Sequence, residues 1–271
     1  MESSSLPSRP PAPRMIGAVN WRGLWTLYVK EVRRFLNIFT QTLLAPVVTT
    51  LLFLAIFALA LGGAGRQTAG VDYIAFLAPG LIMMSLMQNA FANTSSTILV
   101  SKIQGNIVDV LMPPLSAAEL TLGIAGGGLT RGLMVAVAAG LAVSVFAPLG
   151  TYNLLISAYY ALNAALMLSL LGMIGGIWAE KFDHIAAVTN FVIMPLSFLS
   201  GTFYSVERLP ENWRFIADFN PFFYLIDGFR YGFIGHADGS LAVGAVVVLV
   251  VNAALWALTH RMFAVGYRLK P

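Results

Sequence analysis

Long apolar runs dominate the chain after residue 38, and six of them are long enough to cross a bilayer. A transmembrane helix needs about 20 predominantly apolar residues. Runs of that length predict spans near residues 39–61, 73–94, 117–147, 154–178, 187–203 and 241–261. We therefore expect an all-α membrane protein with six transmembrane helices.

The segment before the first span mixes apolar and charged positions at helical spacing. Its apolar side chains recur at steps of three and four residues, at Trp21, Leu24, Trp25, Tyr28, Val32, Phe35 and Leu36. This pattern predicts an amphipathic interface helix over residues 21–37. A helix that serves only as a surface anchor would show the same pattern. The preceding residues 1–18 are rich in Pro and Ser and predict a disordered tail.

The connection between the second and third spans carries a second amphipathic element. Four apolar side chains share one helical face, and Pro113-Pro114 ends the helix; the four are Ile103, Ile107, Val110 and Leu111. A short amphipathic helix at this place is either a docking element or a cap on the loop. The pattern alone leaves both interpretations open.

Residues 204–235, between the fifth and sixth spans, are too polar for a span and too aromatic for a solvated loop. Asn220-Pro221 divides this stretch into two short helices, which predicts an external re-entrant hairpin over a translocation route. An interfacial aromatic belt is the alternative. Asp227 and Arg230 stand three residues apart and can pair on one helical face, as part of an external gate or as an ordinary ion pair.

Composition and charge support the membrane assignment and set the topology. Apolar residues make up 58% of the 271 residues and charged residues only 10%. Lys and Arg concentrate before the first span and after the last, so the positive-inside rule places both termini in the cytoplasm. They form no basic face with interleaved aromatics, which argues against a nucleic-acid partner. Arg131 is the one charge clearly inside a span; we expect it near the cytoplasmic boundary, where it pairs or snorkels.

Pairs of glycines at four-residue spacing mark where helices approach closely. They are Gly123 and Gly127, Gly128 and Gly132, and Gly172 and Gly176. Small residues at this spacing allow close backbone packing in lipid. Because glycine is common in spans anyway, the pairs are packing hints only.

The chain carries no recognisable catalytic apparatus. It has no cysteine, no HExxH and no GxSxG, and its three histidines are far apart, which argues against a metal site. No lysine follows a glycine, so a Walker A loop is excluded. No span carries a central Asp or Glu for ion coupling. Energy must therefore come from elsewhere, or transport is passive. The alternative is a nucleotide-independent channel or secondary transporter. A lipid-acting enzyme is a further alternative, with Glu207, Asp227 and Arg230 as its candidate residues.

Taken together, the order of elements and several stretches resemble the ABC-2-type exporter permeases, in particular their YadH-like branch. The resemblance covers roughly residues 20–268. The stretches that carry it are residues 73–85 (YIAFLAPGLIMMS), 102–116 (KIQGNIVDVLMPPLS), 126–132 (GGGLTRG), 179–185 (AEKFDHI), 198–210 (FLSGTFYSVERLP) and 219–233 (FNPFFYLIDGFRYGF). One departure is Val108-Asp109, where the family often carries an acidic pair.

The resemblance implies a type V exporter fold over residues 19–271 and a location in the bacterial inner membrane. It implies a homodimeric pore driven by two separate ATPase subunits, which would bind the ATP and Mg²⁺, so that this chain needs no cofactor. The substrate would be lipid-like, a glycan-lipid or an amphipathic drug. By this analogy the ATPase-coupling residues are Glu31, Arg33, Arg34, Lys102, Ile103, Gln104, Asn106, Ile107 and Asp109, near the short loop 180–184. The external gate residues are Asn220, Pro221, Asp227 and Arg230.

Overall fold

The computed structural model describes residues 17–61, 67–206, 210 and 219–269. Within these residues, six helices are long and apolar enough to cross a membrane. They are Thr40–Ala60, Tyr73–Ile103, Ala117–Ser144, Leu154–Trp178, Phe182–Leu199 and Leu241–Val265. The six predicted spans are therefore confirmed as helices. The predicted tail lies almost entirely outside the described residues.

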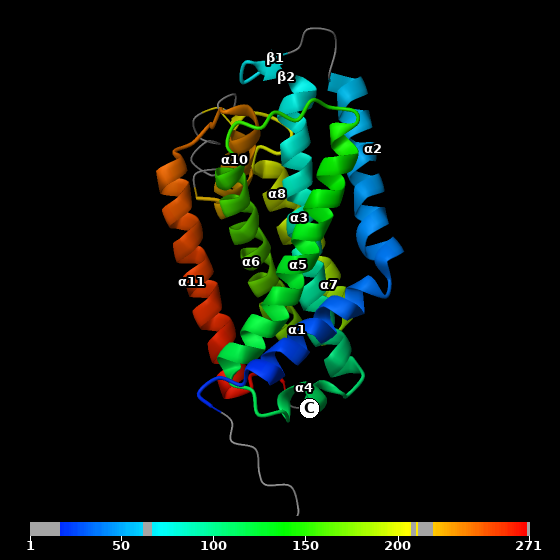
Figure 1. The fold of residues 1–271 in the computed structure, drawn as a ribbon, viewed down its shortest axis with the longest axis vertical. Helices are drawn as coiled ribbons and strands as arrows, with labels where there is room; N and C mark the ends of the chain where they lie inside the picture. The colour runs from blue at the N-terminus through cyan, green and yellow to red at the C-terminus, as the bar shows by residue number, and fades with distance from the viewer. Residues whose placement is uncertain (1–16, 62–66, 207–209, 211–218, 270–271) are drawn as a thin grey trace, which may run out of the picture.

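The helices form one bundle, with α1 (Trp21–Leu36) crossing its lower end at a steep angle to the others (Figure 1). The central helix is α3 (Tyr73–Ile103), which packs against α5 (Ala117–Ser144) and α6 (Leu154–Trp178). The most apolar part of α3 is 78% buried, whereas the corresponding parts of α2 (Ala45–Leu61), the α7 to α8 segment and α11 (Leu241–Val265) are 11–17% buried. These three outer elements leave most of their apolar surface to lipid or to other chains.

Three of the helices have bounds that differ from the predicted ones. The helix of the second span does not end at residue 94 but continues for nine more residues, to Ile103. Its polar residues in this region, including Asn93 and Thr97, are buried against neighbouring helices. The fifth span starts at Phe182 and ends at Leu199, so that residues 182–184 are helical and the connection before it is short. The third ends at Ser144.

Two spans begin or bend at π-helical turns that precede a proline. The turn η1 (Thr40–Leu44) leads into α2, whose second residue is Pro46. In the fifth span α7 (Phe182–Val188) is followed by η2 (Thr189–Ile193) and α8 (Met194–Leu199), whose second residue is Pro195. Proline lacks the N–H that would bond to the carbonyl four residues earlier, so the preceding turn widens. The Thr42 hydroxyl donates to the carbonyl of Phe35 at 2.8 Å and stabilises the first of these turns.

The two ends of the bundle are built differently. At the lower end in Figure 1 lie α1, the short helix α4 (Ile107–Leu111) and the end of the chain. At the upper end lie the antiparallel pair β1 (Gln67–Thr68) and β2 (Val71–Asp72) and the helix α10 (Pro221–Ile234). We call these the α1 end and the α10 end. The first helix of the predicted re-entrant hairpin falls outside the described residues, and the second is α10.

Candidate functional site

Helix α1 lies across a strip of glycines on α5. A Cβ atom added at Gly123 would stand 2.6 Å from Leu27, and one at Gly127 would stand 2.5 Å from the Cβ of Glu31. Only hydrogen at these positions lets the two helices approach this closely. The predicted pair Gly123 and Gly127 is therefore used for packing. It holds α1 against the transmembrane bundle.

The start of α1 is fastened to the start of α5 through one carboxylate. Ser116 and Glu119 form a capping box at the N-terminus of α5. The Glu119 carboxylate also accepts the backbone N–H of Asn20, at 2.5 Å. The Asn20 side chain caps α1 and donates to the carbonyl of Pro114 at 3.2 Å. Thus α1 and the connection between α4 and α5 form one structural unit.

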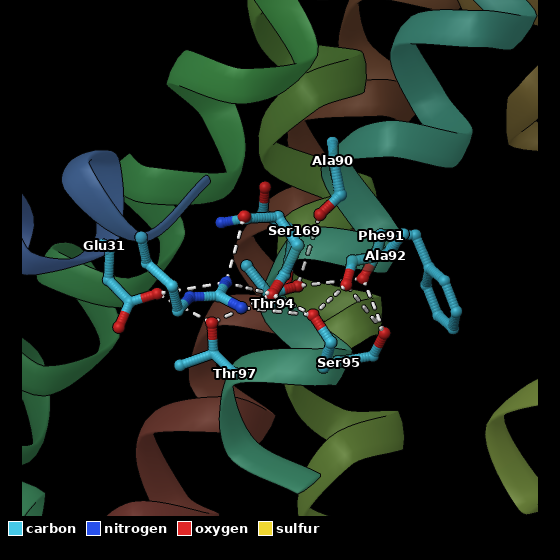
Figure 2. Close-up of polar contacts among 11 residues, drawn as sticks. Glu31, Ala90, Phe91, Ala92, Thr94, Ser95, Thr97 and Ser169 are labelled. Atoms are coloured by element: carbon cyan, nitrogen blue, oxygen red, sulfur yellow. Dashed lines mark hydrogen bonds and ion pairs between the residues drawn. The ribbon is translucent and has the colours of Figure 1, made fainter. Parts of the chain in front are cut away.

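The end of α1 is held by a buried polar cluster on α3 (Figure 2). Thr97 donates to the Glu31 carboxylate at 2.7 Å, and Arg34 lies 3.4 Å from the same oxygen. Arg34 also donates to the backbone carbonyl of Asn93 at 2.8 Å and to its side-chain oxygen at 3.0 Å. Glu31 is only 1% exposed. A carboxylate buried to this extent needs such partners.

A second polar cluster joins α3 to α6 beside the first. Thr94 donates to the backbone carbonyl of Ser169 at 2.8 Å, as Figure 2 shows. Glycines again permit the close approach, because a Cβ at Gly172 would meet the Phe91 carbonyl at 2.5 Å and one at Gly176 would meet the Ser95 carbonyl at 2.8 Å. The bundle next to α1 is thus tightly packed around α3.

The sequence predicts one amphipathic helix that includes both Ile103 and Ile107, but in the structure these residues belong to two separate helices. Helix α3 ends at Ile103, and α4 begins only at Ile107. Gly105 between them has φ +73°, a left-handed conformation that glycine adopts readily and that ends helices. Ile107 and Val110 are buried, whereas Ile103 is 51% exposed. Ile103 therefore does not share their apolar face.

Lys102 closes the C-terminal end of α6. Its ammonium donates to the carbonyls of Ile177 at 2.6 Å and Ala179 at 2.7 Å. These are carbonyls that a helix end leaves without internal partners. On the same end Arg268 donates to the carbonyl of Trp178 at 3.1 Å and lies 3.5 Å from Glu180. Lys102 is thus a structural lysine that joins the C-terminal ends of α3 and α6.

A groove with a volume of about 660 Å³ opens at the α1 end between α1 and the α4 to α5 connection. Its walls carry both charge signs and exposed aromatic surface, and include Trp21, Arg22, Lys30, Asp109, Pro113 and Pro114. Trp21 is 71% exposed, and Met112 beside the groove is 77% exposed. Such a surface, rigidly backed by the contacts described above, suits a protein partner.

The nine predicted coupling residues therefore divide into two groups. Those exposed at the α1 end are Arg33, Ile103, Gln104, Asn106 and Asp109. Those occupied in internal contacts are Glu31, Arg34, Lys102 and Ile107. The second group supports the exposed surface at the α1 end and contributes little to it. Asn20 and Glu119 were missed, although the Ser116-x-x-Glu119 spacing is a capping-box signature in the sequence.

At the α10 end, Asp227 and Arg230 do not form the predicted ion pair. The Asp227 carboxylate accepts the backbone N–H groups of Asp238 and Gly239, each at 2.9 Å. Arg230 donates to the carbonyl of Gly201 at 2.6 Å and lies 3.9 Å from the centre of the Phe76 ring. Both side chains are buried. Each fastens α10 to a different neighbouring segment.

Asn220 and Pro221 start α10 as the sequence indicates. The Asn220 side chain accepts the N–H of Phe222 at 3.0 Å, and Pro221 occupies the first helical position, where its missing N–H is not needed. Asn220 also donates to the Ser200 hydroxyl at 2.8 Å. Glu207, the third candidate for lipid chemistry, lies outside the described residues.

Arg131 is the fifteenth of the 28 residues of α5. It lies four residues, about one helical turn, beyond Gly127, where α5 meets Glu31 of α1. Its guanidinium donates to the side-chain oxygen of Asn89 on α3 at 3.0 Å. No carboxylate of the described residues lies within ion-pair distance of it. It is thus paired with a neutral amide.

Known proteins match this chain over nearly its whole length. Residues 22–234 match the family described as ABC-2 type transporter. The inner membrane transport permease YadH of Escherichia coli strain K12 is 38% identical over 245 residues, which is 89% of this chain and 96% of that protein. Nodulation protein J of Rhizobium leguminosarum bv. trifolii is 29% identical over 246 residues, covering 87% and 90% of the two chains. With six membrane-spanning helices and a family match over most of its length, the chain belongs to the ABC-2 type transporter family of membrane permeases.

Proposed function

We propose that the chain is the permease subunit of an ATP-driven exporter and that a separate ATPase docks at the α1 end. The observation that carries this proposal is the rigid groove between α1 and the α4 to α5 connection. Its charged side chains Arg22, Lys30 and Asp109 form no ion pair with another described residue. The sequence contains no glycine-lysine pair for a Walker A loop, so ATP and Mg²⁺ would bind the partner.

The distribution of charge supports a cytoplasmic position for the α1 end. Basic side chains of the described residues gather there, namely Arg22, Lys30, Arg33, Arg34, Lys102, Lys181, Arg261 and Arg268. At the α10 end the described residues contribute one, the buried Arg230. An excess of Lys and Arg marks the cytoplasmic side of a membrane protein. The same orientation places both chain ends inside, where an ATPase finds its nucleotide.

Exposed polar side chains on the outer helices support a homodimer. Gln41 and Thr49 on the first span and Asn190 on the fifth are exposed at the surface of the monomer. Amide groups that face hydrocarbon are costly, so polar surface in spans usually faces protein or a water-filled path. A second copy packed against these helices would cover them or enclose them in a pore. ATPase closure would then tilt α1 and α4 and open the path outward.

The relatives support a location in the inner membrane, because YadH is an inner membrane transport permease. A multi-pass protein with six apolar spans fits that location. The substrate class that suits a route lined by apolar helices is lipid-like, a glycan-lipid or an amphipathic drug. The α10 helix, held at the opposite end by Asn220, Asp227 and Arg230, would cover the external mouth of the route.

The proposal is tested by co-expression of the full chain with a candidate ABC ATPase subunit and by their co-purification. Met112→Asp places a charge on the exposed side of the groove and should abolish co-purification without loss of thermal stability. Val145→Asp is a matched control, because Val145 is 76% exposed but lies beyond α5 at the α10 end. Ile107 is unsuitable for this test, since it is buried and its replacement would disturb the fold. Full ATPase binding by the Met112 variant, or nucleotide-independent transport in proteoliposomes, would overturn the proposal.

A further inference from the structure

Buried N–H groups without acceptors gather where α1, α3 and α5 meet. They are the Nε groups of Arg34 and Arg131 and the side-chain amide nitrogens of Gln88 and Asn93. We call these four residues the donor cluster. The two guanidinium N–H groups are donors in any orientation. The Asn93 nitrogen is also fixed as a donor, because the Asn93 oxygen already accepts from Arg34.

The members of the donor cluster are neighbours through the antiparallel packing of α3 and α5. Arg131 bonds to Asn89, and a Cβ at Gly127 would lie 3.5 Å from the Asn93 nitrogen, one helical turn along both helices. Arg34 bonds to Asn93 and is close enough for its positive charge to act on Arg131. Gln88 is adjacent to Asn89 on α3.

The cluster carries an uncompensated positive charge. Glu31 lies 3.4 Å from Arg34 and offsets its charge. Arg131 has only the neutral Asn89 amide as a partner among the described side chains. A charge inside a span is costly unless it is paired or used. A bound anion would accept hydrogen bonds from the unpaired N–H groups and would also compensate the positive charge.

A groove leads to this place from the side of the bundle. It has a volume of about 250 Å³ and lies between the first span and α3. Gln88 and Asn89 line it together with Ser85, and Gln41, Thr49 and Thr50 form its opposite wall. The polar wall is unusual for a surface that faces lipid. A ligand could thus enter laterally from the bilayer.

The depth of the cluster matches the level of lipid headgroups. Helix α1 is amphipathic and exposes Trp21 and Trp25, as expected of a helix at the membrane interface. It contacts α3 at Asn93 and Thr97. Asn89 and Arg131 therefore lie about one helical turn, roughly 5 Å, inside the level of α1. This is where the phosphate of an inner-leaflet lipid would meet the protein.

We propose that Arg131, Gln88 and Asn89 form a binding site for the phosphate group of a membrane amphiphile, which enters through the groove between the first span and α3. Arg131 would supply the charge and the Nε donor, and Gln88 would supply a second donor. An arginine binds phosphate more strongly than a neutral side chain does, because its hydrogen bonds are charge-assisted. The site would function whether or not an ATPase is bound.

The test is native mass spectrometry of the purified full chain in detergent, titrated with phosphatidylglycerol and with diacylglycerol of the same acyl chains. We expect retention of phosphatidylglycerol by the wild type. Arg131→Gln should weaken it about ten- to a hundredfold, as loss of a charged hydrogen bond predicts. Arg261→Gln removes the same charge from an exposed position at the end of α11 and should leave the affinity unchanged. Equal binding of phosphatidylglycerol and diacylglycerol would overturn the proposal.

Two further arms keep the test decisive. If Arg131→Gln does not fold, Gln88→Met retains the charge and removes one donor, and a several-fold loss of affinity is expected. Unchanged affinity in the Gln88 variant would then count against the site. Addition of inorganic phosphate distinguishes the sources of the anion. Competition at millimolar phosphate with wild-type protein, absent in Arg131→Gln, supports a phosphate site that accepts the free ion. Competition that is the same in both proteins contradicts it.

Discussion

Thr97 of α3 donates a hydrogen bond to the same carboxylate oxygen of Glu31 that Arg34 approaches within α1. This contact unites an interface helix and the central helix of the bundle. A displacement of α1 would therefore be transmitted to α3. The junction is a buried polar contact, which mutation can weaken without altering the exposed surface.

Glu31→Leu should loosen this junction. The change leaves the Thr97 hydroxyl and the Arg34 guanidinium with fewer acceptors in a buried place. Because Arg34 is one-third exposed, we expect a loss of about 2 kcal/mol, below the full cost of a broken buried ion pair. Thermal unfolding in detergent measures the loss. Arg33→Gln, at an exposed position next to it, should change stability by less than about 0.5 kcal/mol. Similar stability of the two variants would contradict the assigned role of Glu31.

Gly172→Ala should destabilise the contact between α6 and α3. The added methyl group would stand 2.5 Å from the Phe91 carbonyl, which belongs to backbone and cannot rotate away. Overpacking of this kind costs about 1–3 kcal/mol. Gly175→Ala, three residues later in the same helix, has its nearest neighbour at 3.5 Å, a side-chain atom of Ile185, and should be neutral or mildly stabilising. Equal unfolding temperatures for both variants would show that the two helices pack less closely than described.

The number and order of the spans were predictable because each is a long apolar run, and hydropathy responds to the membrane directly. The hydrogen-bond partners of polar residues were harder to predict from the sequence. Arg131 was visible as an intramembrane charge, but its partner Asn89 follows from the register between α3 and α5, which no local pattern encodes. Similarly, the spacing of Asp227 and Arg230 predicts an ion pair, whereas tertiary contacts offer each a backbone partner instead.

The break between α3 and α4 had a signal in the sequence, but that signal could be interpreted in two ways. Gly105 follows a helical run closed by Lys102, an arrangement typical of a helix C-terminus, yet the apolar spacing of Ile103 and Ile107 favours continuity. In the structure Gly105 has a positive φ, and the helix ends before it. As a consequence Ile107 is buried, in a cluster that includes Leu27 and Ile98, while Ile103 is exposed. A single residue thus determines which of these two side chains is exposed.

Glu119→Gln should free the start of α1 more than Ser116→Ala does. The carboxylate accepts the backbone N–H groups of both Ser116 and Asn20, and a glutamine has only one accepting oxygen. Ser116→Ala removes a cap bond of α5 but leaves the bond to Asn20 intact. We expect about 1 kcal/mol for each. Hydrogen exchange separates them, because the Asn20 amide should exchange faster only in the Glu119 variant. Equal acceleration in both would contradict a direct bond.

Arg230→Lys should weaken the attachment of α10 although it keeps the charge. The guanidinium bonds to the Gly201 carbonyl and its central carbon lies 3.9 Å from the centre of the Phe76 ring, a combination that suits a planar group with several donors. A lysine has a compact ammonium that cannot satisfy both contacts, and its burial without partners is costly. We expect a loss of about 2 kcal/mol in thermal unfolding. Asp227→Asn should cost less, about 1 kcal/mol, because the amide oxygen still accepts one of the two N–H groups of Asp238 and Gly239. A stable Arg230→Lys protein would show that charge alone, through Asp227, holds the helix.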